Sequence, residues 1–186
     1  WSATADESLL NKSIQTLPRE LTLGKDGGLR MAPLRELELQ RFDLAAHENI
    51  EVVIPEPKGG TDWKNRTTRI AELDGDAYEI RITVDREEAE RKRFGFRLFT
   101  DESRIGLPIY FQPNNGALRV GGVEAPFKVS DLPEGEDVEL RIFIDKYFVE
   151  VFANNRQAFV AADMNWRDAS GFDAYSFSKP TTIRKV

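Results

Sequence analysis

The 186-residue sequence contains no cysteine and a single histidine, His47. A chain without cysteine has neither a disulfide nor a thiolate nucleophile. We expect His47 to lie at the surface, so the sequence offers no Ser-His-Asp triad, no Cys-His pair and no histidine-cluster zinc site. These absences exclude several common classes of hydrolase and metalloprotein.

Long apolar runs and an excess of positive charge are also missing. No run approaches the roughly 18 residues of a membrane-spanning helix, so we expect no membrane partner. The net charge of −6 argues against a nucleic-acid partner, because phosphates would be repelled. Residues 163–168 contain several oxygen ligands but lack the EF-hand spacing, and no phosphate-binding loop occurs. We therefore predict no metal and no cofactor.

Alternation of apolar and polar residues dominates the sequence from residue 69 onward. Residues 78–84 and 94–98 alternate in this way, which indicates strands with one buried face. Turn signals separate these from further candidate strands, at residues 105–112, 117–120, 138–144, 148–153, 158–162, 174–177 and 182–184. Many short strands with almost no helix predict an all-β fold: a two-sheet antiparallel β-sandwich of the concanavalin-like lectin type.

The first part of the chain is less regular. Residues 13–23 favour an extended structure, and residues 32–37 favour one helical turn that runs into a strand near 37–42. We expect residues 1–31 to form an N-terminal arm and residues 32–186 to form the sandwich. The charged stretch 85–93 is predicted to be a solvated surface loop.

Residues 140–155 form the clearest hairpin signal. Their apolar residues share one parity and predict a core-facing side. A two-residue turn at Asp145–Lys146 would place Arg141 opposite Glu150, and a four-residue turn at Asp145–Phe148 would place them diagonally. In either register we expect Arg141 and Glu150 to form a cross-strand ion pair.

A second interpretation of this hairpin is a sugar site. Carboxylates accept hydrogen bonds from vicinal hydroxyls, and a nearby arginine would donate to the same ring. An independent glycosidase pair is not expected, because nothing apolar surrounds these carboxylates to raise the pKa of an acid. Trp63 and Trp166 are candidate sugar platforms or, alternatively, half-buried hydrophobic plugs. The candidate carbohydrate-binding residues are Asp145, Glu150, Arg141, Arg97, Asp101 and Tyr147.

Three segments, in this order, resemble the C-terminal sandwich of glycoside hydrolase family 32, which includes invertases, levanases and inulinases. Residues 13–23 with 33–37 resemble the segment that leaves the family's catalytic propeller. Residues 94–98, followed by 109–111 and 118–120, resemble its Phe-Gly-Leu-Arg-Leu strand and the strands after it. Residues 145–152 resemble its Asp-Arg-Ser-Ser-Val-Glu-Val-Phe signature, with Asp145, Glu150, Val151 and Phe152 matching.

The sequence departs from this family in informative ways. Lys146 replaces the usual arginine, Tyr147-Phe148 replace Ser-Ser, and Gly121-Gly122-Val123 stand where Asp-Arg-Ser often follows. The propeller motifs Trp-Met-Asn-Asp-Pro-Asn-Gly, Arg-Asp-Pro and Glu-Cys do not occur. The resemblance therefore implies a module without catalytic residues of its own, whose parent protein is a glycosidase.

The resemblance supports three hypotheses. The first is an accessory domain that stabilises a catalytic propeller of the same or a companion chain. The second is a module that binds fructan or fructose, because carbohydrate-binding module family 66 has a related fold. The third is a freestanding lectin-like domain. Since Trp1 is not an initiator methionine, we expect a processed product or a piece of a longer chain, with an extracellular or periplasmic location favoured.

Overall fold

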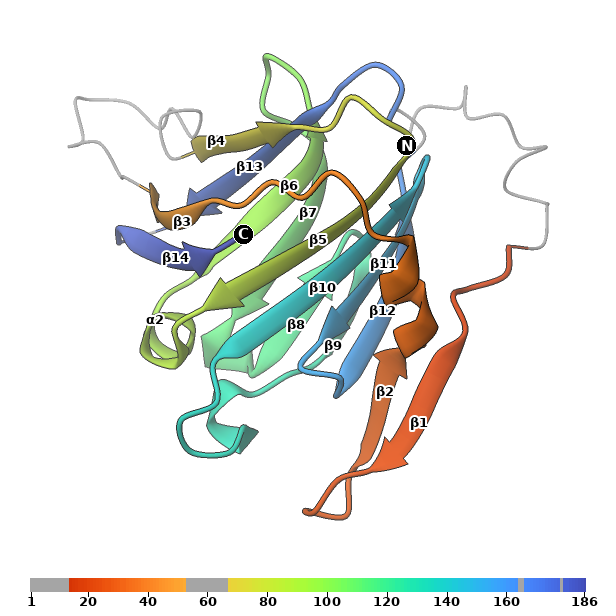
Figure 1. Cartoon of the computed structure of the whole chain (residues 1–186). Coiled ribbons are helices and arrows are strands. Elements are labelled where there is room, and N and C mark those ends of the chain that lie inside the picture. The colour runs from red at the N-terminus through yellow and green to blue at the C-terminus, as the bar shows by residue number, and fades with distance from the viewer. Residues whose placement is uncertain (1–13, 53–66, 164–165, 178) are drawn as a thin grey trace.

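The computed structural model describes residues 14–52, 67–163, 166–177 and 179–186. They form two six-stranded antiparallel sheets packed face to face, with a smaller two-stranded sheet at one side (Figure 1). The predicted two-sheet antiparallel sandwich is therefore confirmed. Within the described residues, no helix is long and apolar enough to cross a membrane.

We call the two large sheets sheet I and sheet II. Sheet I has the order β12 (Gln157–Ala162), β11 (Phe148–Ala153), β10 (Val138–Asp145), β5 (Ala77–Val84), β14 (Thr181–Lys185) and β3 (Glu48–Val52). Sheet II has the order β4 (Thr67–Glu72), β13 (Gly171–Ser176), β6 (Phe94–Thr100), β7 (Leu107–Gln112), β8 (Ala117–Val120) and β9 (Val123–Pro126). Neighbouring strands come mostly from consecutive parts of the chain, whereas β14 and β13 are inserted between earlier strands.

The core lies between the two sheets and follows the predicted alternation. Ile142 and Val151 face each other across the β10–β11 hairpin and are both fully buried. Sheet II contributes phenylalanines, of which Phe94 and Phe111 stack with their ring centroids 5.0 Å apart. Burying such side chains contributes roughly 1.5–3 kcal/mol each, so this core is the main source of stability.

Two local predictions are corrected by the structure. Residues Arg35–Gln40 form a 3-10 helix, η1, where a strand near 37–42 was expected. The charged stretch contains a short helix, α2 (Arg86–Arg91), rather than a loop. Its N-cap is Asp85, which accepts a hydrogen bond from Glu87 N. Ala89 of this helix is fully buried, so α2 packs on the sandwich and is not simply a solvated excursion.

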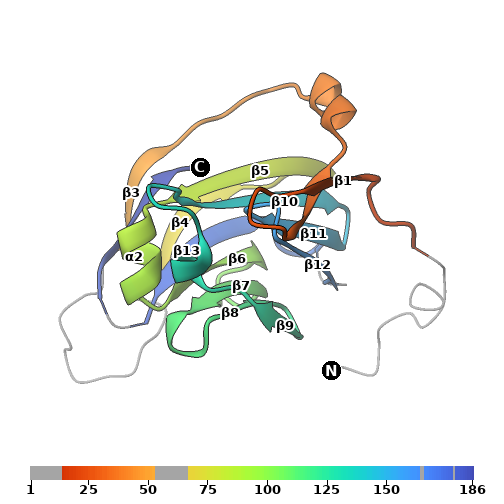
Figure 2. The same ribbon diagram turned by 90° about the horizontal axis from the view of Figure 1, so that it is seen from below.

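Residues 14–46 form a layer over the outer face of sheet I, which we call the N-terminal layer. It contains a hairpin of β1 (Arg19–Leu23) and β2 (Leu29–Pro33), followed by η1. Figure 2 shows η1 above the strands of sheet I. Met31 N donates to Asn155 O over 2.7 Å, which fixes β2 beside β11 and β12. The expected boundary after residue 31 falls within β2.

The β10–β11 register decides where the hairpin side chains point. Asp145 pairs with Phe148, so the turn consists of Lys146 and Tyr147, with Lys146 at a positive φ of 55°. Ile144 pairs with Val149, which is the register that the four-residue turn predicted. The turn itself has only two residues, because Asp145 and Phe148 also pair. Arg141 consequently lies opposite Phe152, and Glu150 lies opposite Phe143.

Candidate functional site

The structure does not bring the six predicted carbohydrate-binding residues into one cleft. Arg141 and Glu150 lie on the outer face of sheet I, beneath the N-terminal layer. Asp145 and Tyr147 lie at or beside the hairpin turn, at one end of the sandwich. Arg97 lies on β6 of sheet II, and Asp101 lies in the loop that follows β6. Periodicity predicted the strands that carry or flank these residues but could not show which strands are neighbours.

Glu150 is the most enclosed of these residues. Only 2% of it is exposed, and its carboxylate accepts hydrogen bonds from Leu17 N at 2.6 Å and from Arg19 Nη2 at 3.1 Å. The Arg19 guanidinium also lies 5.4 Å above the ring of Phe152. The hairpin signature, residues 145–152, therefore contacts the N-terminal segment 13–23, and both are segments that resemble family 32. A sugar could reach Glu150 only if this segment moved away.

Arg141 has a different partner from the one that we predicted. Its Nε donates to Glu79 Oε1 at 2.9 Å, and Arg41 of the N-terminal layer donates to both oxygens of the same carboxylate. The predicted Arg141–Glu150 pair is therefore wrong, because each group has a closer partner from another segment. No local pattern predicted the Arg141–Glu79 pair, since β5 and β10 are separated by more than fifty residues.

The Glu79 cluster predicts a dependence of stability on pH. Burial would raise the pKa of Glu79, but hydrogen bonds from Arg41 and Arg141 prevail and lower it. A carboxylate whose folded pKa lies below its unfolded value of about 4.3 stabilises the fold above that pH, and this contribution is lost as the pH falls through the folded value. We expect the urea midpoint of the wild type to fall more steeply below pH 4.3 than that of Glu79→Gln. Equal slopes of urea midpoint against pH for the wild type and Glu79→Gln would contradict this prediction. Glu139→Gln on β10 is the matched control.

Arg97 is stacked against an aromatic side chain. Its guanidinium lies 4.0 Å from the ring centroid of Tyr175, which is 4% exposed. Burial lowers the pKa of Arg97 and raises that of Tyr175. This arrangement packs the outer face of sheet II and lies apart from the hairpin turn.

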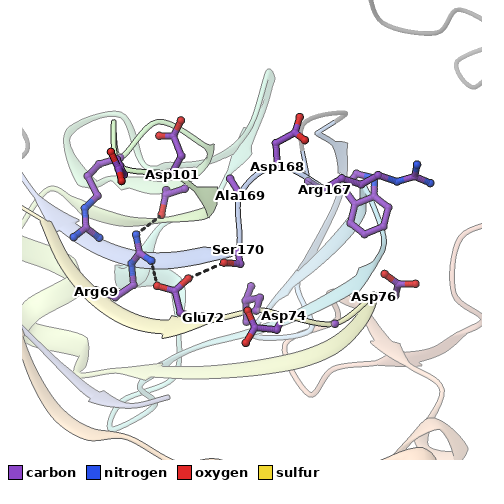
Figure 3. Close-up of a pocket in the computed structure, with 15 residues that line it drawn as sticks. Arg69, Glu72, Asp74, Asp76, Asp101, Arg167, Asp168, Ala169 and Ser170 are labelled. Atoms are coloured by element: carbon purple, nitrogen blue, oxygen red, sulfur yellow. Dashed lines mark hydrogen bonds and ion pairs between the residues drawn. The ribbon is translucent and has the colours of Figure 1, made fainter.

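A pocket of about 1070 Å³ opens at the end of the sandwich that carries the hairpin turn. Three loops form it: the β4–β5 turn, the β6–β7 loop and the segment before β13. Figure 3 shows its labelled side chains. The lining residues are Arg69, Glu72, Leu73, Asp74, Gly75, Asp76, Thr100, Asp101, Glu102, Arg104, Trp166, Arg167, Asp168, Ala169 and Ser170.

Asp173 is the buried anchor beside this pocket. It is fully buried and accepts hydrogen bonds from Arg69 Nε at 2.6 Å, Arg104 Nη1 at 2.7 Å and Thr100 Oγ1 at 2.7 Å. Burial opposes the charge of Arg69, yet the hydrogen bond to Asp173 raises its pKa. Asp173 thus ties β13 to β4 and to the β6–β7 loop. Asp173 was not predicted as a site residue, because its only sequence signal was a single aspartate within an otherwise apolar strand.

The pocket rim carries carboxylates on two sides. Figure 3 shows Asp101 and Asp168 on one side and Asp74 and Asp76 on the other. Asp101 is the one predicted site residue that lines the pocket, and Trp166 lines it while also packing partly against the core. Trp63 lies outside the described residues. Among the described residues, no group of three or more acidic or histidine side chains is placed to hold a metal ion.

Comparison with known proteins aligns most of this chain with one part of several longer proteins. It is 29% identical to the levanase of Bacillus subtilis (strain 168) over 202 aligned residues, which cover 94% of the chain and 27% of the levanase. The exo-inulinase of Aspergillus awamori has the same fold, with a TM-score of 0.67, 13% identity and coverage of 91% of this chain and 35% of the inulinase.

Further solved structures agree in fold. The β-fructofuranosidase of Bombyx mori gives a TM-score of 0.59 at 19% identity, and fructan 1-exohydrolase IIa of Cichorium intybus gives 0.59 at 14% identity. Each covers 91% of this chain, which spans 31% and 39% of those proteins. The model of the glycosyl hydrolases family 32 C-terminal domain matches residues 46–179, which contain nearly all of both large sheets. The chain therefore belongs to the C-terminal domain family of the glycoside hydrolases of family 32.

Proposed function

We propose that this domain stabilises the catalytic propeller of a family 32 glycosidase and performs no hydrolysis itself. The observation that carries the proposal is an apolar surface on the N-terminal layer, which includes nearly all of the segments at 13–23 and 33–37 that resemble the exit from the propeller. The relatives support it, since this chain spans only 27% to 39% of the length of the four compared above.

The apolar surface has two parts, both on the N-terminal layer. On the β1–β2 hairpin, Leu23 and Leu29 form a cross-strand pair and are 76% and 56% exposed. In η1 and just after it, Leu39, Phe42 and Leu44 are 87%, 80% and 95% exposed. Water-exposed apolar side chains gathered on one segment are typical of an interface with another protein surface. We infer that the propeller of the parent protein covers them.

The inner side of the same layer is fixed to the sandwich. Glu150 holds Leu17 and Arg19, and Glu79 holds Arg41, so the layer is a rigid connection rather than a loose tether. Because the layer is fixed to the sandwich, a propeller that packs on its apolar outer side is held in a defined position. The hairpin signature takes part in this connection, and its carboxylate Glu150 is not free to act as a catalytic acid.

A propeller from the same reading frame, or from a companion gene, provides the test. Produced with this domain, the propeller should unfold several degrees higher than when produced alone, because binding to the folded state stabilises it. The double variant Leu23→Ser, Phe42→Ser should lose this gain and keep the unfolding temperature of the isolated domain. Differential scanning calorimetry measures both.

Two results would overturn the proposal. A propeller that is equally stable with and without the domain would remove the stabilising role. Release of fructose from sucrose, levan or inulin by the purified domain alone would remove the claim that it does not catalyse hydrolysis. Ser130→Asn, at an exposed position in the 3-10 turn Val129–Asp131 and outside the N-terminal layer, serves as a neutral surface control.

A further inference from the structure

The outer face of sheet II gathers arginines and aromatic rings. Four residues on adjacent strands are register partners and form one row across this face: Tyr175, Gly95, Tyr110 and Arg119. The residues that alternate with them along these strands belong to the core, so the row lies on the opposite side of the sheet. Because Gly95 has no side chain, the ring of Phe177 reaches both tyrosines, with centroid distances of 5.3 Å to Tyr175 and 6.2 Å to Tyr110. We name this surface the arginine–aromatic face, and it consists of Arg93, Arg97, Tyr110, Arg119, Tyr175 and Phe177.

Two arginines of this face lie against rings rather than carboxylates. The guanidinium of Arg93 lies 4.3 Å from the ring centroid of Phe177 and 6.0 Å from that of Tyr110. The guanidinium of Arg119 lies 5.9 Å from the same tyrosine ring. In the part of the chain that the structure describes, neither Arg93 nor Arg119 forms an ion pair with a carboxylate, whereas Arg41 of the N-terminal layer pairs with two. Two positive charges therefore lie side by side without an acidic partner on a protein whose net charge is −6.

The acidic register partner of Arg119 does not neutralise it. Glu124 of β9 lies opposite Arg119, but its carboxylate accepts a hydrogen bond from Gln112 Nε2 at 2.8 Å. Arg119 instead donates from Nε to Gly121 O at 3.0 Å and from Nη1 to Tyr110 Oη at 3.2 Å. These two bonds fix the plane of the guanidinium and leave its Nη2 without a hydrogen-bond partner among the described residues. A guanidinium that is fixed in this way suits the planar, two-point binding of a carboxylate.

The composition of the face favours an acidic segment of another protein as its partner. Tyrosine and arginine are enriched at protein interfaces and among the residues that dominate their binding energy. Arg93 is exposed, and Tyr110, Arg119 and Phe177 are half-buried, so a partner meets rings as well as charges. A nucleic acid fits this protein less well, because its dense phosphate charge is repelled by the net charge of −6.

We propose that the arginine–aromatic face binds an extended acidic segment of a partner protein, with Arg93 and Arg119 binding its carboxylates and Tyr110 and Phe177 packing against it. Both guanidiniums surround one ring, that of Tyr110, so a single short segment reaches both. In an extended segment, alternate side chains share one face and lie about 7 Å apart, so acidic residues at alternate positions present their carboxylates together.

This binding goes beyond the proposed contact with a propeller. Figure 2 shows η1 above sheet I and strands β7 and β8 on the opposite side of the sandwich. A propeller that packs on the N-terminal layer therefore leaves the arginine–aromatic face accessible. The two surfaces are tested by different variants.

A fluorescein-labelled octapeptide of alternating aspartate and valine is the probe, and fluorescence anisotropy with the full chain is the measurement. Valine favours the extended conformation. We expect saturable binding with a Kd of about 0.1 mM in about 0.02 M sodium chloride, and at least about fivefold weaker binding in about 0.5 M, because salt screens the charges. The same peptide with asparagine in place of aspartate should not bind. An oligothymidylate of the same length should bind more weakly than the acidic peptide.

Variants locate the site on sheet II. Arg93→Gln and Arg119→Gln should each weaken peptide binding about threefold, and the double variant about tenfold, because each removes one partner of a carboxylate. Arg93→Lys retains the charge but not the planar group, so it should weaken binding less than Arg93→Gln does. Arg81→Gln is the matched control and should bind as the wild type does. Arg81 is an exposed arginine on β5 of sheet I that has no ion pair among the described residues.

The two proposals are separable in the same set of variants. Leu23→Ser, Phe42→Ser should bind the acidic peptide as the wild type does, although it no longer stabilises the propeller. Arg93→Gln, Arg119→Gln should still stabilise the propeller. Thermal unfolding verifies that each variant is folded, and Arg119→Lys replaces Arg119→Gln if the latter is not.

Any of three results would overturn the inference. The first is no saturable binding of the acidic peptide at up to about 2 mM protein, where even a Kd of about 1 mM gives more than half occupancy. The second is binding of the asparagine peptide or the oligothymidylate at least as tightly as the acidic peptide. The third is wild-type affinity in the double variant Arg93→Gln, Arg119→Gln.

Discussion

Replacement of Asp173 by alanine should lower the free energy of unfolding by about 3 kcal/mol, since removal of one partner from a buried ion pair leaves the other charge uncompensated. Asp173 is fully buried and holds Arg69, Arg104 and Thr100 at once. The side chains of Arg69 and Arg104 are 27% and 31% exposed and can regain some hydration, which is why we expect the lower end of the 3–5 kcal/mol range. Urea unfolding monitored by tryptophan fluorescence measures the change.

Two variants make this result interpretable. Asp131→Ala removes an exposed aspartate elsewhere and should change the unfolding free energy by less than about 0.5 kcal/mol. Asp173→Asn preserves the shape of the side chain but not its charge. Its decrease in the free energy of unfolding should therefore lie between the decreases for Asp131→Ala and Asp173→Ala. If Asp173→Ala were no more destabilising than Asp131→Ala, the anchoring role of Asp173 would be wrong.

Glu150→Ala should release the N-terminal layer from sheet I. The buried carboxylate binds both a backbone N–H and the guanidinium of Arg19, so its loss removes two hydrogen bonds, and the one to Arg19 is also an ion pair. We expect a cost of about 3 kcal/mol, again from a broken buried pair. Amide hydrogen exchange should accelerate throughout β1 and β2 while β10 stays protected, because the layer can open without the sandwich unfolding.

A double-mutant cycle with Arg19→Ala isolates the interaction. If the two side chains act together, the double variant should cost less than the sum of the two single variants, with a coupling of about 1–3 kcal/mol. Glu139→Ala on the adjacent strand β10 is the matched control and should leave exchange in β1 and β2 unchanged. Additive effects would indicate that Glu150 and Arg19 stabilise the layer separately.

The fold was predictable because burial on one face of a strand leaves a period of two in the sequence. Residues 78–84 and 138–144 display it clearly, and both became strands of sheet I. The short strands β3 and β9 were missed, since four or five residues at a sheet edge carry too little alternation. Residues 35–40 carry leucines among glutamates and fit either a strand or a helix, and the structure has η1 there.

The candidate sites were harder to predict because they depend on contacts between distant segments. Glu150 was assigned to the outer face of its strand, but nothing near it in the sequence indicated that Leu17 and Arg19 would cover that face. The pocket likewise joins three loops that lie far apart in the chain, and only their tertiary arrangement brings Asp101 and Trp166 to the same cavity. A period-two pattern indicates which face of a strand is buried in the core. It does not indicate which segment covers the opposite face.

The position of β14 has a consequence for how the protein is made. Residues 181–185 lie between β5 and β3, so a late segment of the chain supplies the strand that connects two earlier ones. During translation, β3 therefore has no lateral partner in sheet I until these residues leave the ribosome. We expect nascent chains arrested before residue 181 to bind chaperones and to be digested readily by protease. Arrest beyond the point at which residue 185 has emerged should yield a protected domain.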